Sequence, residues 1–321
     1  MTGWRRVRRW LTPVFVSAVL GVAAFLIYRA LTRYSLDEIV TSITSVPIDH
    51  IARMGLFAAA SYLCLTCFDA MGVRYVGRSL PYWRVAMTSF VALSIGHNVG
   101  FAALSSGAVR YRLYSQWGLS AAEVVKLILF CALTVGLGLG ILGGLALLLR
   151  PALAQEITRL DRGVILALGA ACMLVAIAYL AAAALIRRPL PFRRWPLALP
   201  SLKLALGQMV IGPINFAFVA ACLYEALAAT AEVTYLGVAT VYVIANVAVL
   251  LSHVPGGLGV IEGVVLFLLP DQQVIGALIL FRVAYFLVPL CIGSLSFALI
   301  ELLMRARGRA GRTAECRDQP G

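Results

Sequence analysis

Long runs without a formal charge constrain this chain more than any other feature. Such runs exceed the roughly 18 apolar residues that mark a membrane-spanning helix, and four are clear: Trp10–Tyr28, Leu127–Leu149, Gly163–Ile186 and Leu204–Tyr224. The composition agrees, because 62% of the 321 residues are hydrophobic and only 13% are charged, about half the charged share of a soluble domain. Inside a bilayer only helices or closed barrels satisfy the backbone. The sequence therefore predicts an all-α, polytopic membrane helical bundle.

The basic residues predict which loops face the cytoplasm. The chain carries 27 Lys and Arg against 14 Asp and Glu, a net charge of +13. In a soluble protein this excess would indicate nucleic acid, but here the cations gather between apolar runs, as cytoplasmic loops do. We expect no nucleic-acid partner, and a multi-pass protein of the cell inner (plasma) membrane with both termini in the cytoplasm. The five clusters cover residues 5–9, 74–84, 110–126, 187–203 and 305–317.

Two apolar stretches disturb the alternation of sides that this charge count requires. Val85–Val109 has basic residues on both flanks, whereas Val233–Ile261 has acidic flanks. Each is therefore predicted to be a re-entrant, broken-helix hairpin that returns to the side from which it entered. The alternative is eight simple spans, which places Arg187–Lys203 outside. The preferred topology has six crossing helices, at about 10–28, 54–73, 127–149, 163–186, 204–224 and 272–303.

The two unusual stretches also resemble each other. Residues 85–110 can be laid on 238–262 at an offset of about 152, which matches Gly107 and Arg110 with Gly259 and Glu262. The same offset lays Leu127–Leu149 on the last apolar helix. A repeat that enters once from each face is typical of membrane transporters, whose sites lie at the broken segments. We predict one integral membrane domain over 1–304, with inverted pseudo-repeats at about 1–150 and 151–304. A short basic tail over 305–321 is expected to be disordered.

The stretch SHVPGGLGVIEGV, Ser252–Val264, contains the second break. Pro255, Gly256 and Gly257 are predicted to end one half-helix, and the run from Leu258 to start another. Non-helical backbone at membrane depth survives only when it is buried in protein or lines a polar cavity. The first turn of the second half-helix presents free N–H groups and the positive end of the dipole. This break is therefore a candidate site for an anion or a polar headgroup.

Charged residues in and near the apolar runs are the other candidates for this site. Arg282 lies about ten residues into the last apolar helix, where an unpaired charge is costly. It is expected either to bind an anion such as lipid phosphate, or to pair with Glu262 or Asp69; the two interpretations are compatible. Glu262 either binds a cationic headgroup or caps the half-helix. Asp69 either meets a headgroup amine or forms an interfacial ion pair with Arg74.

Polar residues also mark the first stretch. His97 and Asn98 lie at its expected turn, as His253 does at the turn of the second. Such histidines are interpreted as hydrogen-bonded structural residues, with a proton relay as the alternative. Arg110 and Arg112 follow the first stretch among aromatic residues, as interfacial anchors that could also bind phosphate.

No motif for catalysis is visible in the sequence. There is no GxSxG, no P-loop, no paired CxxC and no metal-ligand spacing among the histidines. Cys64 and Cys67 are expected to pack as small apolar residues. Asn215 and Asn246 are expected to form interhelical hydrogen bonds. We therefore expect neither an enzyme nor a cofactor.

Two motifs carry a family resemblance. GHNVGFAALSSGAVRYRLYSQWGLS at 96–120 and SHVPGGLGVIEG at 252–263 resemble the membrane domain of lysylphosphatidylglycerol synthetases, also called multiple peptide resistance factors. The N-terminal segment and residues 67–82 are similar too. In full-length members, the membrane region moves aminoacylated phosphatidylglycerol between leaflets and a cytosolic domain synthesises it. Here only a short Arg-rich tail follows Met304, so the resemblance implies the lipid-translocating part without the synthase domain.

These observations lead to one preferred function and one alternative. The preferred function is a bacterial inner-membrane flippase that moves an anionic or aminoacylated phospholipid of the phosphatidylglycerol type. The phosphate would lie at Arg282 and the half-helix, and Glu262 and Asp69 would meet any cationic part of the lipid. The alternative is a non-transporting membrane subunit that presents lipid to a separate lipid-modifying enzyme.

Overall fold

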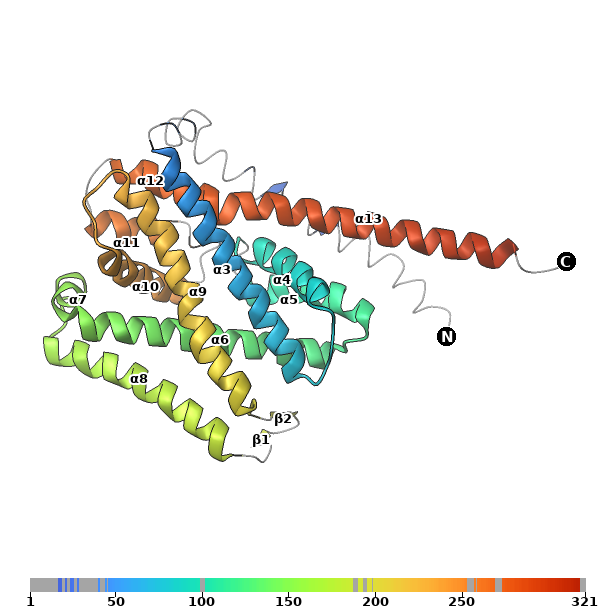
Figure 1. The fold of residues 1–321 in the computed structure, drawn as a ribbon, viewed down its shortest axis with the longest axis horizontal. Coiled ribbons are helices and arrows are strands. Elements are labelled where there is room, and N and C mark those ends of the chain that lie inside the picture. The colour runs from blue at the N-terminus through green and yellow to red at the C-terminus, as the bar shows by residue number, and fades with distance from the viewer. Residues whose placement is uncertain are drawn as a thin grey trace.

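The computed structural model is a bundle of α-helices (Figure 1). It describes residues 46–98, 102–186, 190–192, 195–197, 199–252, 257, 259–268 and 273–317, and isolated positions before residue 46. The helical elements are α3 (Ile48–Tyr75), α4 (Tyr82–Gly96), α5 (Ala102–Tyr114), η1 (Ser115–Trp117), α6 (Ala121–Leu149), α7 (Pro151–Thr158), α8 (Arg162–Leu185), α9 (Leu202–Ala228), α10 (Tyr235–Ser252), α11 (Val260–Leu268), α12 (Gln273–Arg282), η3 (Val283–Leu287) and α13 (Val288–Arg317).

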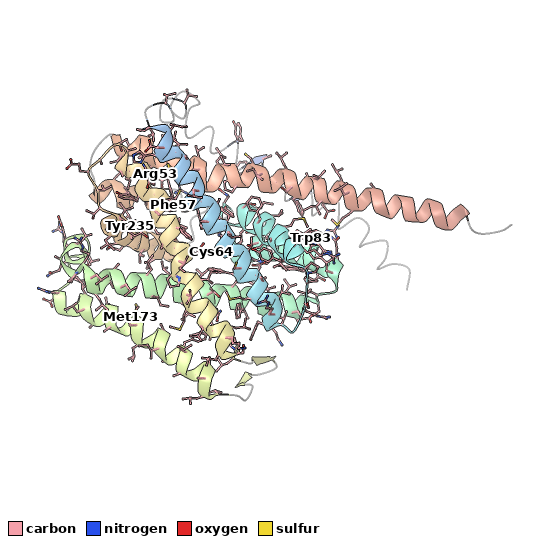
Figure 2. The ribbon with its side chains drawn as sticks, viewed as in Figure 1. Arg53, Phe57, Cys64, Trp83, Met173 and Tyr235 are labelled. Carbon is pink, nitrogen blue, oxygen red and sulfur yellow. The ribbon has the colours of Figure 1, made fainter. Side chains whose placement is uncertain are left out.

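Five helical segments in the described part are long and apolar enough to cross a membrane. They correspond to five of the six predicted crossing helices, and the predicted helix at 10–28 lies almost entirely outside the described residues. Large apolar side chains remain exposed on several of them, above all on α8, where Leu174 is 67% exposed. Figure 2 draws the side chains of this helix and labels Met173, the residue before Leu174. Such a surface suits lipid and not water. The all-α membrane bundle is confirmed; its spans are Ile48–Tyr75, Ala121–Leu149, Arg162–Leu185, Leu202–Ala228 and Val274–Met304.

Both stretches that disturb the charge alternation are interrupted helices. The first is divided into α4 and α5, and the second into α10 and α11. The two helices of each unit pack against each other. At 1.5 Å per residue, α5 is about 20 Å long and α11 about 14 Å, so neither crosses a hydrocarbon core of about 30 Å. Each stretch is therefore an interrupted helix, which is the form expected of the predicted broken-helix hairpins.

The order of elements repeats along the chain. The series α3, α4–α5 and α6 recurs as α9, α10–α11 and α12–α13. α6 begins at Ala121 and α12 at Gln273, which is the offset found in the sequence. α3 and α9 pack along their lengths at the centre of the bundle (Figure 1). The main hydrophobic core draws buried residues from both series, so the two halves share one interior.

Glycines let α6 approach its neighbours closely. A Cβ added at Gly138 would lie 2.5 Å from the backbone carbon of Gly212 on α9. A Cβ added at Gly144 would lie 3.1 Å from the backbone oxygen of Gly169 on α8. Small residues at such crossings bring helix backbones together, which is how packing stabilises helices in lipid.

Two regions differ from the sequence expectation. The tail at 305–321 was expected to be disordered, but α13 continues through it to Arg317. The segment is rich in Ala and Arg, which favour helix, and extending an existing helix needs no new nucleation. The expected loop at 187–203 contains a small antiparallel ribbon, in which β1 (Leu190–Phe192) pairs with β2 (Trp195–Leu197).

Candidate functional site

Arg282, the last residue of α12, forms a bidentate ion pair with Glu262 in the first turn of α11. Its Nε donates to Oε1 at 2.7 Å, and its Nη2 donates to Oε2 at 2.9 Å. Nη2 also donates to the carbonyl oxygen of Gly257 at 2.7 Å. The guanidinium carbon lies 4.9 Å from the ring centre of Phe286. Of the two partners proposed for Arg282, the structure therefore shows Glu262 and not Asp69.

Glu262 also caps α11, whose first turn contains it. Its Oε2 accepts the backbone N–H of Gly259 at 2.9 Å. Gly257 and Gly259 have φ values of 59° and 86°, which only glycine adopts without strain. One guanidinium and one carboxylate therefore satisfy backbone groups of Gly257 and Gly259, just before α11. His253 and Gly256, which belong to the same predicted site, lie outside the described residues.

Asp69 is the centre of a second buried cluster. It accepts from Nε and Nη2 of Arg110 at 2.9 and 2.7 Å, and from the hydroxyl of Tyr114 at 3.0 Å. Asp69 is fully buried and Arg110 is 3% exposed. The expected pair between Asp69 and Arg74 is wrong, because Arg74 is exposed and Asp69 is bound by Arg110. The interpretation of Arg110 as an interfacial anchor is wrong for the same reason.

Arg112 also has a partner that the sequence analysis missed. Its Nε and Nη2 donate to the two oxygens of Glu301 at 2.8 and 3.0 Å. Glu301 is only 2% exposed, so the pair ties α5 to the middle of α13. As with Arg110, the structure gives Arg112 a carboxylate inside the bundle in place of the expected role as an interfacial anchor.

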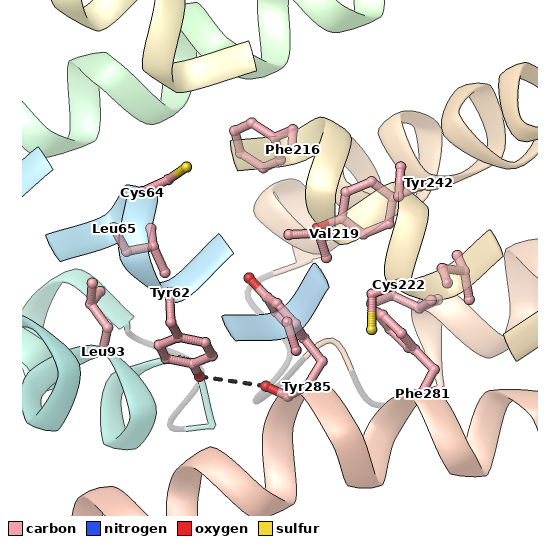
Figure 3. Close-up of a cluster of buried hydrophobic side chains, with 14 of the residues drawn as sticks. Tyr62, Cys64, Leu65, Leu93, Phe216, Val219, Cys222, Tyr242, Phe281 and Tyr285 are labelled. Atoms are coloured by element: carbon pink, nitrogen blue, oxygen red, sulfur yellow. Dashed lines mark hydrogen bonds between the residues drawn. The ribbon is translucent and has the colours of Figure 1, made fainter. Parts of the chain in front are cut away.

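A short π-helix, η3, lies between α12 and α13. A π turn is wider than an α turn and is stabilised by contacts from neighbouring elements. The carbonyl oxygen of Tyr285 accepts from the hydroxyl of Tyr62 at 3.4 Å (Figure 3), and that of Phe286 accepts from Asn98 at 3.4 Å. The Tyr285 hydroxyl lies 2.9 Å from the Oγ of Ser61. Side chains from α3 and from the first break therefore hold η3 in place.

Asn215, Asn246 and His97 differ in the hydrogen bonds of their side chains. Asn215 accepts from Ser61 at 2.8 Å, so the expected interhelical hydrogen bond is confirmed. Asn246 donates to the carbonyl oxygen of Tyr242 in its own helix, so the same expectation for Asn246 is wrong. The Nδ1 of His97 is buried and has no hydrogen-bond partner among the described residues. The structural hydrogen bond expected of His97 is therefore not seen at this atom.

Sequence reasoning missed a polar cluster at the other end of α3. Glu225 on α9 lies 2.8 Å from Nδ1 of His50 and 3.1 Å from Nε of Arg53 (Figure 2 labels Arg53). The signs visible in the sequence were His50 and Arg53 at the start of one apolar helix and Glu225 at the end of another. No group of three or more His, Cys, Asp or Glu suited to a metal is found among the described residues.

Broken helices and buried ion pairs within an apolar bundle define a multi-pass α-helical membrane protein with polar sites inside the bundle. The chain belongs to the family described as the lysylphosphatidylglycerol synthase TM region, whose model matches residues 14–293. The resemblance seen in the sequence motifs is thereby confirmed over nearly the whole chain.

Individual relatives divide into proteins of the same extent and longer proteins. An uncharacterized protein of Synechocystis, slr0712, is 31% identical over 96% of this chain and 97% of its own length. The inner membrane protein YbhN of Escherichia coli is 27% identical over 93% of each chain. A phosphatidylglycerol lysyltransferase of Staphylococcus aureus is 22% identical over 87% of this chain but only 32% of its own length. The similarity to that lysyltransferase therefore covers only part of it.

Proposed function

We propose that this chain is a lipid flippase of a bacterial inner membrane, with both termini in the cytoplasm and no enzymatic activity of its own. Its substrate is an anionic or aminoacylated phospholipid of the phosphatidylglycerol type. The family match supports the membrane role, and the names of two relatives supply the inner membrane and the lipid class. The α4–α5 and α10–α11 units are the two opposed re-entrant hairpins of this transporter.

The observation that carries the proposal is the ion pair of buried Arg282 with partly buried Glu262 at the second break. A bilayer makes a charged pair costly, so such residues mark the paths of polar substrates. A lipid phosphate can replace Glu262 at the guanidinium fork, because each presents two anionic acceptor oxygens that the fork can bind side by side. Glu262 is then released to meet a cationic group on the same lipid. With an aminoacylated lipid, the exchange keeps both charges of this pair matched by an opposite charge.

The first break contacts the helical segment that follows Arg282. Asn98 donates to η3, which follows Arg282 directly and supplies the Phe286 ring beneath its guanidinium. A displacement of Arg282 by substrate therefore acts on the element that the first unit holds. This gives the two halves a physical connection through which one could open as the other closes. No nucleotide-binding motif is visible, so movement is downhill or coupled to an ion or the membrane potential.

Lipid movement in proteoliposomes that contain only this protein tests the proposal. Fluorescent phosphatidylglycerol and its lysyl derivative are compared for the wild type and Arg282→Ala. We expect rapid movement in the wild type and at least a tenfold loss in the variant. Arg78→Ala is the control, because Arg78 pairs with Glu123 at an exposed position and its loss should leave movement unchanged.

Two outcomes would contradict the proposal. A folded Arg282→Ala protein that moves lipid normally would remove Arg282 from the transport site. A folded wild type that moves neither lipid would favour the non-transporting subunit, which would then copurify with a lipid-modifying enzyme.

A further inference from the structure

At the start of α4, the guanidinium group of Arg84 lies against two tryptophans. Its carbon is 5.3 Å from the ring centre of Trp83 and 5.5 Å from that of Trp117. Trp117 belongs to η1, at the far end of α5, so the two ends of the α4–α5 unit meet here. Aromatic rings attract a cation but do not neutralise its charge. They also do not accept hydrogen bonds from the N–H groups that point outward in the plane of the guanidinium.

The Nε of Arg84 has no acceptor, unlike the Nε of the arginines that form ion pairs. It is buried and has no hydrogen-bond partner among the described residues, and Arg84 forms no ion pair with any of them. Buried donors in folded proteins are almost always satisfied, so this one requires an acceptor from outside the described chain. In five other arginines of the described part, Nε contacts a carboxylate: Arg53, Arg78, Arg110, Arg112 and Arg282.

The surroundings of Arg84 indicate what that acceptor is. Trp83 is 60% exposed, and Tyr82 and Tyr111 are each 48% exposed (Figure 2 labels Trp83). Exposed Trp and Tyr side chains are typical of the headgroup level of a membrane. The basic clusters that flank the unit place this end at the cytoplasmic leaflet, which carries anionic lipids. The acceptor available at that level is a lipid phosphate.

We propose that Arg84, Trp83 and Trp117 form a binding site for the phosphate of an anionic phospholipid in the cytoplasmic leaflet. The exposed Trp83 ring turns aside to admit the lipid, and Nε and one Nη then donate side by side to two phosphate oxygens, the bidentate geometry that arginine favours. The two rings hold the guanidinium at the headgroup level and cover the glycerol part of the lipid. The site is separate from Arg282, and its occupation requires no lipid movement.

Quenching of tryptophan fluorescence by brominated lipids tests this site directly. In nanodiscs, a protein with Trp4, Trp10 and Trp195 replaced by Phe keeps Trp83 and Trp117 as its fluorophores. Brominated phosphatidylglycerol and brominated phosphatidylcholine are compared at equal mole fraction. We expect about a tenfold preference for phosphatidylglycerol, the effect of one charge-assisted hydrogen-bonded pair.

Variants at Arg84 distinguish the contribution of the bidentate guanidinium from that of the positive charge. Arg84→Gln should bring the preference close to one, and Arg84→Lys should keep part of it, because lysine retains the charge without the fork. Arg162→Gln is the matched control: Arg162 is exposed at the start of α8, on the side expected to face away from the cytoplasm, and its loss should change nothing. Size-exclusion profiles and thermal melting establish folding, and Arg84→Lys alone carries the test if Arg84→Gln does not fold.

Three results would overturn the proposal. Equal quenching by both lipids in the protein with Arg84, or an unchanged preference in a folded Arg84→Gln or Arg84→Lys protein, would show that Arg84 selects no lipid. Loss of the preference in millimolar inorganic phosphate would assign the site to free phosphate instead. Because the measurement records binding alone, its failure leaves the proposed transport standing, and failure of transport leaves this site standing.

Discussion

The side-chain amide of Asn98 donates a hydrogen bond to the carbonyl oxygen of Phe286, 3.4 Å away. Asn98 lies at the break between α4 and α5, while the Phe286 ring lies beneath the Arg282 guanidinium that is bound to the break before α11. The two interrupted units, which are far apart in the sequence, therefore meet at one short π-helix. An α-helix and a π-helix differ by one residue in the spacing of their hydrogen bonds, and in the proposed transport η3 is the element that would carry a change from one break to the other.

Replacing Asn98 should therefore affect lipid movement more than stability. Asn98→Ala removes the donor to Phe286, and we expect a loss of about 1–3 kcal/mol for the carbonyl left without it, together with slower lipid movement. Asn246→Ala is the control, because the side-chain amide of Asn246 donates its hydrogen bond within its own helix, to the carbonyl oxygen of Tyr242 at 3.0 Å. Proteoliposome assays on both variants measure the difference. Equal rates in the two would remove η3 from the transport path.

The Asp69–Arg110 pair should be essential for stability. Asp69→Asn leaves a guanidinium buried without a counter-charge, which costs about 3–5 kcal/mol, whereas Arg78→Gln at an exposed pair should leave stability nearly unchanged. Thermal melting in detergent compares the two. The double variant Asp69→Asn/Arg110→Gln should recover part of the loss, because neither charge then remains. A double variant less stable than both single variants would refute this electrostatic explanation.

The contrast between Asp69 and Glu262 shows what a sequence can predict here. Glu262 lies next to its glycine-rich turn, so its role as a cap could be predicted from the neighbouring sequence. Arg282 was already a candidate partner. Asp69 was assigned to Arg74 because the two are close in sequence. Residues five apart on a helix, however, point about 140° away from each other. That geometry was available and excluded Arg74, but nothing local could identify Arg110 as the true partner.

The spans were predictable for a different reason. Length and hydropathy are properties of a continuous segment, so five crossing helices and the position of both breaks followed from the sequence. The pairing of Arg112 with Glu301 and the π-turn depend on how remote helices meet. The helical tail through Arg317 was missed because its charges were interpreted as solvated, although its residues are good helix formers.

Any side chain at Gly138 should destabilise the protein, because α6 and α9 cross closely there. An added Cβ would lie within 2.5–2.8 Å of backbone atoms of Gly212, which cannot rotate away as a side chain can. We expect Gly138→Ala to cost about 1–3 kcal/mol through overpacking. Gly140→Ala, on the same helix with nothing within 4 Å, should be neutral or gain up to about 1 kcal/mol from helix propensity. Melting temperatures that fall equally in both would show that backbone contact is not what limits this position.

Cysteine labelling at the two ends of α9 should establish the topology. Ser201 and Glu232 are exposed just before and just after this helix, and each is changed to Cys in a background without the seven native cysteines. If both interrupted units are re-entrant, a membrane-impermeant maleimide added to spheroplasts labels Glu232→Cys at once and Ser201→Cys only after permeabilisation. Eight simple spans require the reverse at both positions. Because α9 crosses once in either case, the two sites must behave oppositely, and labelling of both from outside would indicate leaky cells and not a third topology.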